Sequence, residues 1–291
     1  MKCRDLLKII EHFYPVNTAY NFDNVGLLCG RYEKEVKKVY IALDPTDSVI
    51  ADAASWQADL LITHHPMILS PFKSVTDGDY IGRRLIQLIQ HDISYYAMHT
   101  NYDVMRLGEL TGEILGLTNL RVLSEGLSLE ESDLVREQVK SNPPREGLSP
   151  LTNENIWENK DLEPLGIGVI GNLPDVISLR DCCELVKEKF NLQEVKVFGD
   201  LARLVKRVGI APGSGKSTIP AGISKKIDVL VTGDIGHHEG LSGIDHQLAI
   251  IDAGHYNTEV PFIEDMKDFL IKQNLNLEIK TEEVCTPYQM I

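Results

Sequence analysis

Residues 37–66, KKVYIALDPTDSVIADAASWQADLLITHHP, contain the pattern that decides the fold. The apolar, β-branched run at 37–44 predicts a strand, 47–58 predicts a helix, and Leu60–Thr63 predict a second strand. Because these apolar runs are continuous rather than alternating, we expect both faces of the strands to be covered. Two strands joined by a helix in this way form a βαβ unit of a mostly parallel sheet.

The same alternation continues downstream and returns near the C-terminus. From Ile41 to Thr63 the spacing is 22 residues, and from Ile210 to Thr232 it is again 22. Duplication would explain this match, although generic βαβ units also share such a spacing by chance. We expect two linked α/β lobes with mostly parallel or mixed sheets covered by helices. The further predicted elements are strands at 93–99, 206–212, 227–233 and 248–255 and helices at 81–91, 217–226 and 238–247.

The composition changes between the two lobes. Residues 123–163 are polar and rich in Glu, Ser, Asn and Pro, which predicts a linker or a peripheral insertion. Residues 164–174 then predict a strand and a turn, and 178–190 predict an amphipathic helix with Ser178 at its N-cap. The predicted organisation is a first lobe at 1–120, a polar segment at 121–163 and a second lobe at 164–291.

Charge and cysteine content exclude several classes of protein. The 291 residues include 43 acidic and 29 basic side chains, a net charge of −14, which argues against non-specific binding of nucleic acid. No apolar run approaches the ~18 residues that a membrane span needs. Five cysteines without a CxxC pair predict neither a disulfide framework nor a thiolate zinc site. Residues 1–15 predict an amphipathic helix rather than a signal peptide, so we expect a cytoplasmic protein.

Histidines and carboxylates gather where the predicted strands end. In open α/β sheets ligands bind beyond the carboxyl ends of the strands, so these side chains stand where a site is expected. Imidazole and carboxylate suit Zn, Fe, Mn, Co or Ni. The residues at these strand ends are His64, His65, His99, Asp103, His237, His238, His255 and Glu259.

Three histidines, one Asp and one Glu exceed the needs of one tetrahedral ion and suit two ions bridged by a carboxylate and a water. Simpler explanations stay open for single residues. Asp103 could cap a helix that begins near Val104, and Glu259 could interact with a helix dipole. For His12, His91 and His246 we expect structural roles only. GSGKS at 213–217 departs from the phosphate-loop pattern, because Ile210 stands where that pattern needs glycine. Its backbone N–H groups could still receive an anion.

Five segments together resemble the NIF-three-like family, whose members are often described as GTP cyclohydrolase type 2 homologues. They are NFDNVGLLCG (21–30), LLITHHP (60–66), MHTNYD (98–103), VTGDIGHHE (231–239) and IDAGHYNTE (251–259). The resemblance covers roughly residues 1–120 and 161–291. It implies two α/β lobes with a metal pair in the cleft between them, and a ring-shaped homohexamer.

The resemblance also implies the ligands. Two divalent ions per chain, of Zn, Fe, Mn or a similar metal, would be held by His64, His65, Asp103, His255 and Glu259. His99 would support a ligand or face the substrate. Phe22 stands where the family often has Trp, and this exchange affects packing more than chemistry.

Two functions follow from such a centre. The first is a metal-dependent hydrolase, cyclohydrolase-like or phosphoesterase-like, in which a metal-bridging hydroxide attacks a nucleotide or another phosphoester-like small molecule. His99 or His238 would then transfer protons, because imidazole titrates near neutral pH. The alternative is a non-catalytic metal-binding scaffold, metal chaperone or regulatory interaction protein. The ligand types suit both functions equally.

Overall fold

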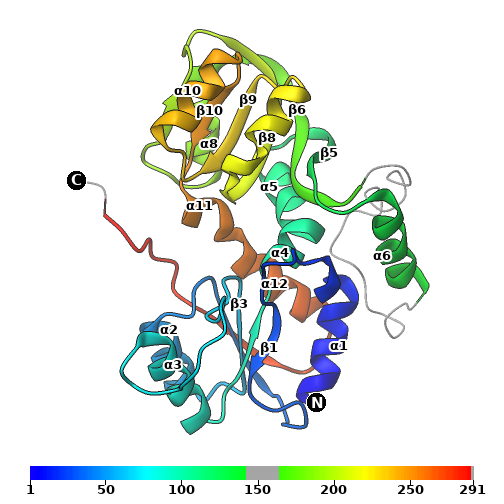
Figure 1. Ribbon diagram of the computed structural model, residues 1–291, viewed down its shortest axis with the longest axis vertical. Coiled ribbons are helices and arrows are strands. Elements are labelled where there is room, and N and C mark those ends of the chain that lie inside the picture. Colours follow the sequence, from blue (N-terminus) through cyan, green and yellow to red (C-terminus); the bar gives the residue numbers. More distant parts are fainter. Residues whose placement is uncertain (142–163, 290–291) are drawn as a thin grey trace. The chain divides into compact units, whose positions relative to one another are not determined.

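The computed structural model describes residues 1–141 and 164–289, which form two compact units (Figure 1). Of these residues, the first unit comprises 1–102, 133–141 and 262–284. The second unit comprises 103–132, 164–261 and 285–289. Each unit has its own sheet covered by helices, which confirms the predicted α/β class.

The first unit is built on a five-stranded sheet with the order β1-β4-β3-β2-β11. β2, β3, β4 and β11 run parallel, and β1 pairs with β4 in the antiparallel direction. The parallel pairing of β2 with β3 confirms the βαβ unit predicted within residues 37–66. The strand bounds are β1 Gly26–Cys29, β2 Lys38–Ala42, β3 Leu60–Thr63, β4 Ser94–Ala97 and β11 Glu278–Thr281.

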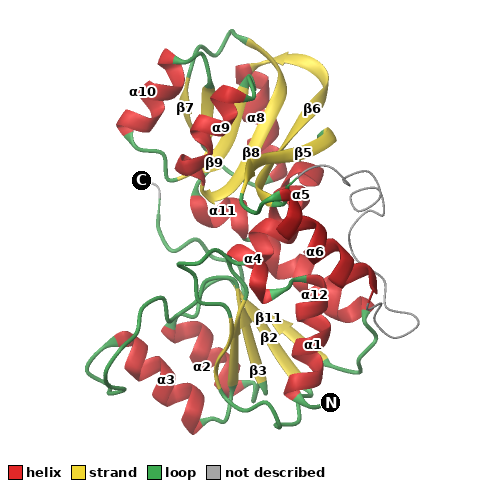
Figure 2. Ribbon diagram, turned by 45° about the vertical axis from the view of Figure 1, so that its right-hand side comes forward, coloured by secondary structure: helices red, strands yellow, loops and turns green. Residues whose placement is uncertain are grey.

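Helices cover both faces of this sheet. Figure 2 shows α2 and α3 on one side, and α1 and α12 on the other. Thr46 caps α2 by accepting a hydrogen bond from Val49 N, and Asp79 caps α3 by accepting one from Gly82 N. The bounds are α1 Cys3–Phe13, η1 Val16–Thr18, α2 Asp47–Ser55, α3 Tyr80–Gln90, α4 Thr100–Tyr102, α6 Leu129–Ser141 and α12 Pro261–Lys272.

The second unit is built on a six-stranded sheet with the order β5-β6-β8-β9-β10-β7. β8, β9 and β10 run parallel, as predicted, and the flanking pairs are antiparallel. In both sheets a strand residue pairs with the residue 21 positions later, Ile41 with Ile62 and Ile210 with Val231. The strand bounds are β5 Thr118–Glu125, β6 Gly166–Ser178, β7 Lys196–Phe198, β8 Leu204–Ser214, β9 Val229–Gly233 and β10 Ala249–Asp252.

Short helices follow the strands of the second unit. Ser178 caps α8 as predicted, since its hydroxyl accepts a hydrogen bond from Asp181 N. Cys182 and Cys183 lie buried against the sheet, where α8 packs on it. The bounds are η2 Asp103–Leu107, α5 Gly108–Ile114, α8 Leu179–Lys189, η3 Gly215–Thr218, α9 Ile219–Ser224, α10 His237–Asp245 and α11 His255–Glu259.

The unit boundaries differ from the boundaries suggested by composition. β5 pairs with β6 in the second sheet, and β11 pairs with β2 in the first. The described part of the polar segment 121–163 holds the end of β5 and helix α6, and residues 142–163 lie outside the described residues. These pairings join segments far apart in the chain, so local composition carries no signal for them.

Two further features of the elements follow from the structure. β6 continues to Ser178 beyond the predicted turn, because the register with β8 shifts between Asn172 and Ile177. Pro174, which has no N–H to donate, stands in that irregular stretch. Among the described helices, none has both the length and the apolar content that a membrane crossing demands.

Candidate metal centre

Three histidines converge at the carboxyl ends of two neighbouring strands in the first unit. His64 and His65 follow β3, and His99 follows the parallel strand β4. Because Thr63 pairs with Ala97, the two strands end at the same level. One ring nitrogen of each histidine lies within 4.8 Å of those of the other two. The fold thus brings together three of the histidines that the strand ends indicated.

Each of these rings is held through its Nδ1 atom. The partners are a backbone carbonyl or a carboxylate, which only accept hydrogen bonds, so Nδ1 carries the proton and the neutral ring has its lone pair on Nε2. Metal-binding histidines show the same arrangement, in which the hydrogen bond fixes the tautomer and the ring orientation. The hydrogen bonds run from His64 to Met98 O at 2.8 Å, from His65 to Asp44 Oδ1 at 2.8 Å and from His99 to Asp23 Oδ1 at 3.0 Å.

The buried side chain of Asp23 accepts the hydrogen bond from His99 and orients its ring. Its side chain is 0% exposed, and it also accepts hydrogen bonds from Thr100 N at 2.9 Å and Thr100 Oγ1 at 2.6 Å. Burial opposes the charge, but the hydrogen bonds from His99 and Thr100 outweigh it and hold the pKa of the Asp23 carboxyl well below its usual value. A carboxylate charge therefore stands behind the His99 ring.

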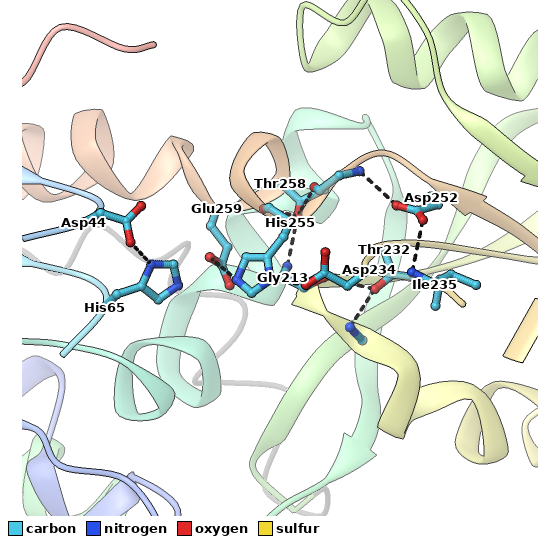
Figure 3. A network of polar contacts seen from close by, with 12 residues as sticks. Asp44, His65, Gly213, Thr232, Asp234, Ile235, Asp252, His255, Thr258 and Glu259 are labelled. Atoms are coloured by element: carbon cyan, nitrogen blue, oxygen red, sulfur yellow. Dashed lines mark hydrogen bonds and ion pairs between the residues drawn. The ribbon is translucent and has the colours of Figure 1, made fainter. Parts of the chain in front are cut away.

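The second unit presents a histidine between two carboxylates. His255 begins α11 and Glu259 ends it, so the two side chains share one face of the helix. His255 Nδ1 lies 2.7 Å from Asp234 Oδ2, and His255 Nε2 lies 3.0 Å from Glu259 Oε2. Figure 3 shows the His255 ring between these two carboxylates.

This arrangement calls for a cation at His255 Nε2. Asp234 accepts the hydrogen bond of Nδ1–H, so Nε2 of a neutral ring and the Glu259 carboxylate would otherwise face each other with lone pairs. Either a second ring proton or a metal ion relieves that repulsion. Ligand bonds of about 2.0–2.2 Å to a tetrahedral zinc ion place two ligand atoms roughly 3.3 Å apart. The 3.0 Å between Nε2 and Oε2 is close to that spacing.

Gly213 makes room for the Glu259 carboxylate. Its φ is +68°, and a Cβ there would stand 2.0 Å from Glu259 Oε1. Gly213 N donates to Thr258 Oγ1 at 2.9 Å, and Gly215 N donates to Thr232 Oγ1 at 2.9 Å. The loop at 213–217 therefore uses these two N–H groups to hold its neighbours rather than to receive an anion.

Asp252, at the end of β10, is hydrogen-bonded to the backbone next to Asp234 and next to His255. Its carboxylate accepts hydrogen bonds from Ile235 N at 3.0 Å and Gly254 N at 3.2 Å (Figure 3). Lys196 Nζ forms an ion pair with the same carboxylate at 2.8 Å. The loop that carries Asp234 and the start of α11 are thereby tied to one buried group.

Comparisons with known proteins agree with this architecture. The sequence profile described as Duf34/NIF3 (NGG1p interacting factor 3) matches residues 1–287. This chain belongs to the DUF34/NIF3 family. A Clostridium perfringens relative named GTP cyclohydrolase 1 type 2 homolog is 30% identical over 298 residues, which cover 100% of both chains.

Solved structures of DUF34/NIF3 relatives share the fold. A Staphylococcus aureus protein superposes with a TM-score of 0.81 at 28% identity, and a Bacillus cereus protein related to NIF3 with a TM-score of 0.82 at 24% identity. Each alignment covers 100% of this chain and 99% of the other. The resemblance stated from the sequence motifs is confirmed.

Two of the predicted site residues of this DUF34/NIF3 chain, Asp103 and His238, are not in the groups of described side chains that are spaced to hold a metal ion. Asp103 begins the π-helical turn η2, a type of turn that is frequent at functional sites. His238 is exposed at the start of α10, with its ring centroid 5.3 Å from that of His237.

Sequence reasoning missed the acceptors that orient the rings. Asp44 and Asp234 lie within two residues of the ends of β2 and β9, so the strand-end rule would have selected them if it had been applied to every carboxylate. Asp23 gave no such signal, because it stands before β1 rather than after a strand. Only its place in the NFDNVG segment marked it.

Proposed function

We propose that this chain is a dinuclear metal-dependent hydrolase that acts on a nucleotide or another phosphoester-like small molecule. In this proposal the ligands are His64, His65, Asp103, His255 and Glu259. The observation that carries the proposal is the position of the His255 ring between two carboxylates, 2.7 Å from Asp234 and 3.0 Å from Glu259. The Nδ1 hydrogen bonds of His64 and His65 support it.

Bound divalent ions would acidify a water molecule and polarise a carbonyl or phosphoryl oxygen of the substrate. Side chains of the protein would orient the ligands and transfer protons. Asp44 and Asp234 keep the protons of His65 and His255 on Nδ1, so that each Nε2 stays a donor of electrons. His99 would move a proton at its Nε2 atom, with Asp23 stabilising the charged ring. His238, which is exposed at the start of α10, would be the alternative proton-transfer group.

The names of the relatives indicate the first substrate to try. The Clostridium perfringens and Clostridium acetobutylicum relatives are both named GTP cyclohydrolase 1 type 2 homolog. GTP also has the two kinds of centre that such a site would act on, a purine-ring carbon and a phosphoester. We therefore place GTP at the head of a panel of nucleotides and simple phosphoesters.

The test combines metal content with turnover. Protein purified without chelator and then offered Zn, Fe(II) or Mn should hold two ions per chain, and the loaded form should hydrolyse a member of the panel. Glu259→Gln keeps the size of the side chain but removes its charge, so turnover should fall at least about 100-fold. Glu264→Gln is the matched control, because Glu264 is exposed and pairs only on the surface with Lys267.

The outcomes separate the two functions. If the protein binds two ions per chain but turns over no substrate of the panel, the metal-binding scaffold or chaperone becomes the better explanation than the hydrolase. If every form of the protein binds only trace amounts of metal, the proposed assignment of the ligands is wrong.

A further inference from the structure

We propose that Phe22 binds the planar base of a nucleotide, which stacks on the phenyl ring. The inference rests on the proposed function in one respect, because it takes a nucleotide as the substrate. It deepens that function by selecting nucleotides over phosphoesters that lack an aromatic ring. It also assigns a binding role to a residue outside the proposed ligands and proton-transfer groups.

The side chain of Phe22 is unusually exposed for an aromatic residue. Among the described residues, none of the large hydrophobic side chains is more exposed than Phe22, at 69%. The ring therefore contributes little to the core, contrary to the packing role expected from the sequence. Tyr20 lies beside it, with ring centroids 5.9 Å apart and planes at 73°. An exposed ring gains free energy when a second flat, apolar surface covers it.

The turn that carries Phe22 is held at both ends by Thr100. Asp23 N donates to Tyr20 O at 2.9 Å, which closes a turn over residues 20–23. Tyr20 N donates to Thr100 Oγ1 at 2.9 Å, and the Asp23 carboxylate accepts hydrogen bonds from the N and Oγ1 atoms of Thr100. Because the backbone under Phe22 is already fixed by these bonds, stacking a base on the ring orders little of the chain and costs little entropy.

Hydrogen bonds also tie this turn to both loops that carry the histidines of the first unit. Thr100, which holds the turn, directly follows His99 in the chain. Asn24, the residue after the turn, donates from Nδ2 to Ile68 O at 2.7 Å. Ile68 belongs to the loop that follows β3 and carries the other two rings. The turn with Phe22 therefore adjoins the loops that form the histidine cluster.

The pairing of β1 places Phe22 at the same edge of the sheet as the histidines. β1 runs antiparallel to β4, and Gly26 at its start pairs with Ala97 at the end of β4. The residues before β1 thus lie at the edge where His99 emerges, and the residues after β1 lie toward the opposite edge. Tyr32 is one of the latter, and its carbonyl accepts a hydrogen bond from Arg4 N at the start of α1.

The chemistry of a phenyl ring specifies the part of the ligand that it binds. Phe22 has no side-chain donor or acceptor, so it contacts a ligand through dispersion and the hydrophobic effect. Nucleobases are flat and stack on aromatic side chains with little preference among bases. A phosphate or a ribose offers no such surface. A nucleotide with its base on Phe22 would extend from there toward the histidines.

The first test uses tryptophan as a reporter in the full chain, without added metal. In Phe22→Trp a stacked base should quench the new fluorescence, and the quenching should saturate. Tyr32→Trp is the matched control, because Tyr32 is also exposed, at 57%, but lies toward the other edge. The probes are GTP and ATP, with ribose 5-phosphate and tripolyphosphate as compounds without a base. We expect saturable quenching only by the nucleotides and only in Phe22→Trp.

The second test measures affinity by isothermal titration calorimetry. Phe22→Ala should weaken GTP binding about 5- to 100-fold, which corresponds to roughly 1–3 kcal/mol. Phe22→Tyr keeps the aromatic ring and should bind GTP within about threefold of the wild type. Phe22→Leu keeps apolar bulk without a flat ring and should not restore binding. If GTP is turned over, Phe22→Ala should raise KM and leave kcat nearly unchanged. Circular dichroism checks that each variant is folded.

Three results would overturn the inference. They are the absence of saturable quenching of Phe22→Trp by either nucleotide, equal quenching in Tyr32→Trp, and GTP binding that is equally tight in Phe22→Ala and the wild type. A lower mass of Phe22→Ala by light scattering would overturn it as well, because the ring would then serve a contact between copies of the chain.

The outcomes also distinguish this inference from the proposed hydrolase. Binding of GTP that depends on Phe22, without turnover of any member of the panel, would support the inference and refute the hydrolase. Turnover of a nucleotide with the same KM in Phe22→Ala and the wild type would support the hydrolase and overturn the inference.

Discussion

At the level of single residues, the candidate site depends on which ring nitrogen carries the proton. Four histidines, His64, His65, His99 and His255, all donate from Nδ1 to an acceptor that lies elsewhere in the chain. A hydrogen bond of this kind selects one tautomer and restrains the ring, so Nε2 is presented in a fixed direction. Losing such a partner typically lowers metal affinity 10–100-fold.

A substitution at Gly213 tests the space around Glu259. Gly213→Ala should lower the free energy of unfolding by about 1–2 kcal/mol, because the φ of +68° is unfavourable for alanine. It should also reduce metal content, because the new Cβ would stand 2.0 Å from Glu259 Oε1. Urea unfolding and elemental analysis measure the two effects.

Gly116→Ala is the matched control for that change. Gly116 has a φ of +71°, but a Cβ there would meet nothing within 4 Å. It should therefore show the backbone cost while keeping the metal. Equal metal content in the two variants would mean that Gly213 does not position the carboxylate.

At the level of the elements, parallel strand pairing brings candidate ligands to one edge of each sheet. β3 and β4 are adjacent and parallel, so the residues after Thr63 and Ala97 emerge at the same edge. β9 and β10 are likewise parallel, and they deliver Asp234 and His255 to the edge of the second sheet. Antiparallel neighbours would have sent these side chains to opposite edges.

Glu11, in helix α1, should make the stability of the folded protein depend on pH. Burial is the main cause that raises the pKa of the Glu11 carboxyl, although Tyr96 donates a hydrogen bond to it. Because the folded pKa lies above the unfolded value of about 4.3, the stabilisation is complete below that pH and is lost as the pH rises through the folded pKa. Ionised Glu11 therefore costs stability at neutral pH.

Glu11→Gln removes that cost and keeps an acceptor for Tyr96. We expect the melting temperature at pH 7 to rise by roughly 1–3 °C, with the gain shrinking as the pH approaches 4. Thermal melts across this range measure the effect, and Glu130→Gln, on the exposed part of α6, is the control. A pH-independent difference would show that ionisation of Glu11 is not the cause.

At the level of the whole molecule, the chain crosses between its units more than once. It passes from the first unit to the second after Tyr102, belongs to the first unit again at 133–141, and returns to it once more at Phe262, so neither unit is a continuous segment. The proposed metal ligands are divided in the same way, with His64 and His65 in the first unit and Asp103, His255 and Glu259 in the second. The ring of six chains implied by the family resemblance stays a prediction, which the mass in solution would check.

Metal binding through the proposed ligands should stabilise the native state. A ligand at a hundredfold excess over its Kd contributes about 2.7 kcal/mol. We expect a chelator to lower the melting temperature of the wild type by several degrees. His255→Ala should lower it similarly and make it largely insensitive to chelator, whereas His91→Ala should keep the full response. Identical chelator responses of the wild type and His255→Ala, measured by calorimetry, would refute the role of His255 as a metal ligand.

The sequence by itself determined the α/β class, most strands and helices, and the residue types at the strand ends. These properties are local, because a run such as Leu60–Thr63 followed by His64 and His65 shows both its strand and its polar end within a few residues. The five motif segments are short and local as well, and they were enough to indicate the family whose profile matches residues 1–287.

Only the tertiary structure decided which groups orient the ligands and where the units divide. Asp44 reaches His65 across 21 residues and Asp23 reaches His99 across 76, while β11 returns to pair with β2 near the other end of the chain. Hydrophobic periodicity records which face of an element is buried, but it does not record what that face meets. The partners of these rings are set by strand order and helix packing, which arise when distant segments of the chain come together.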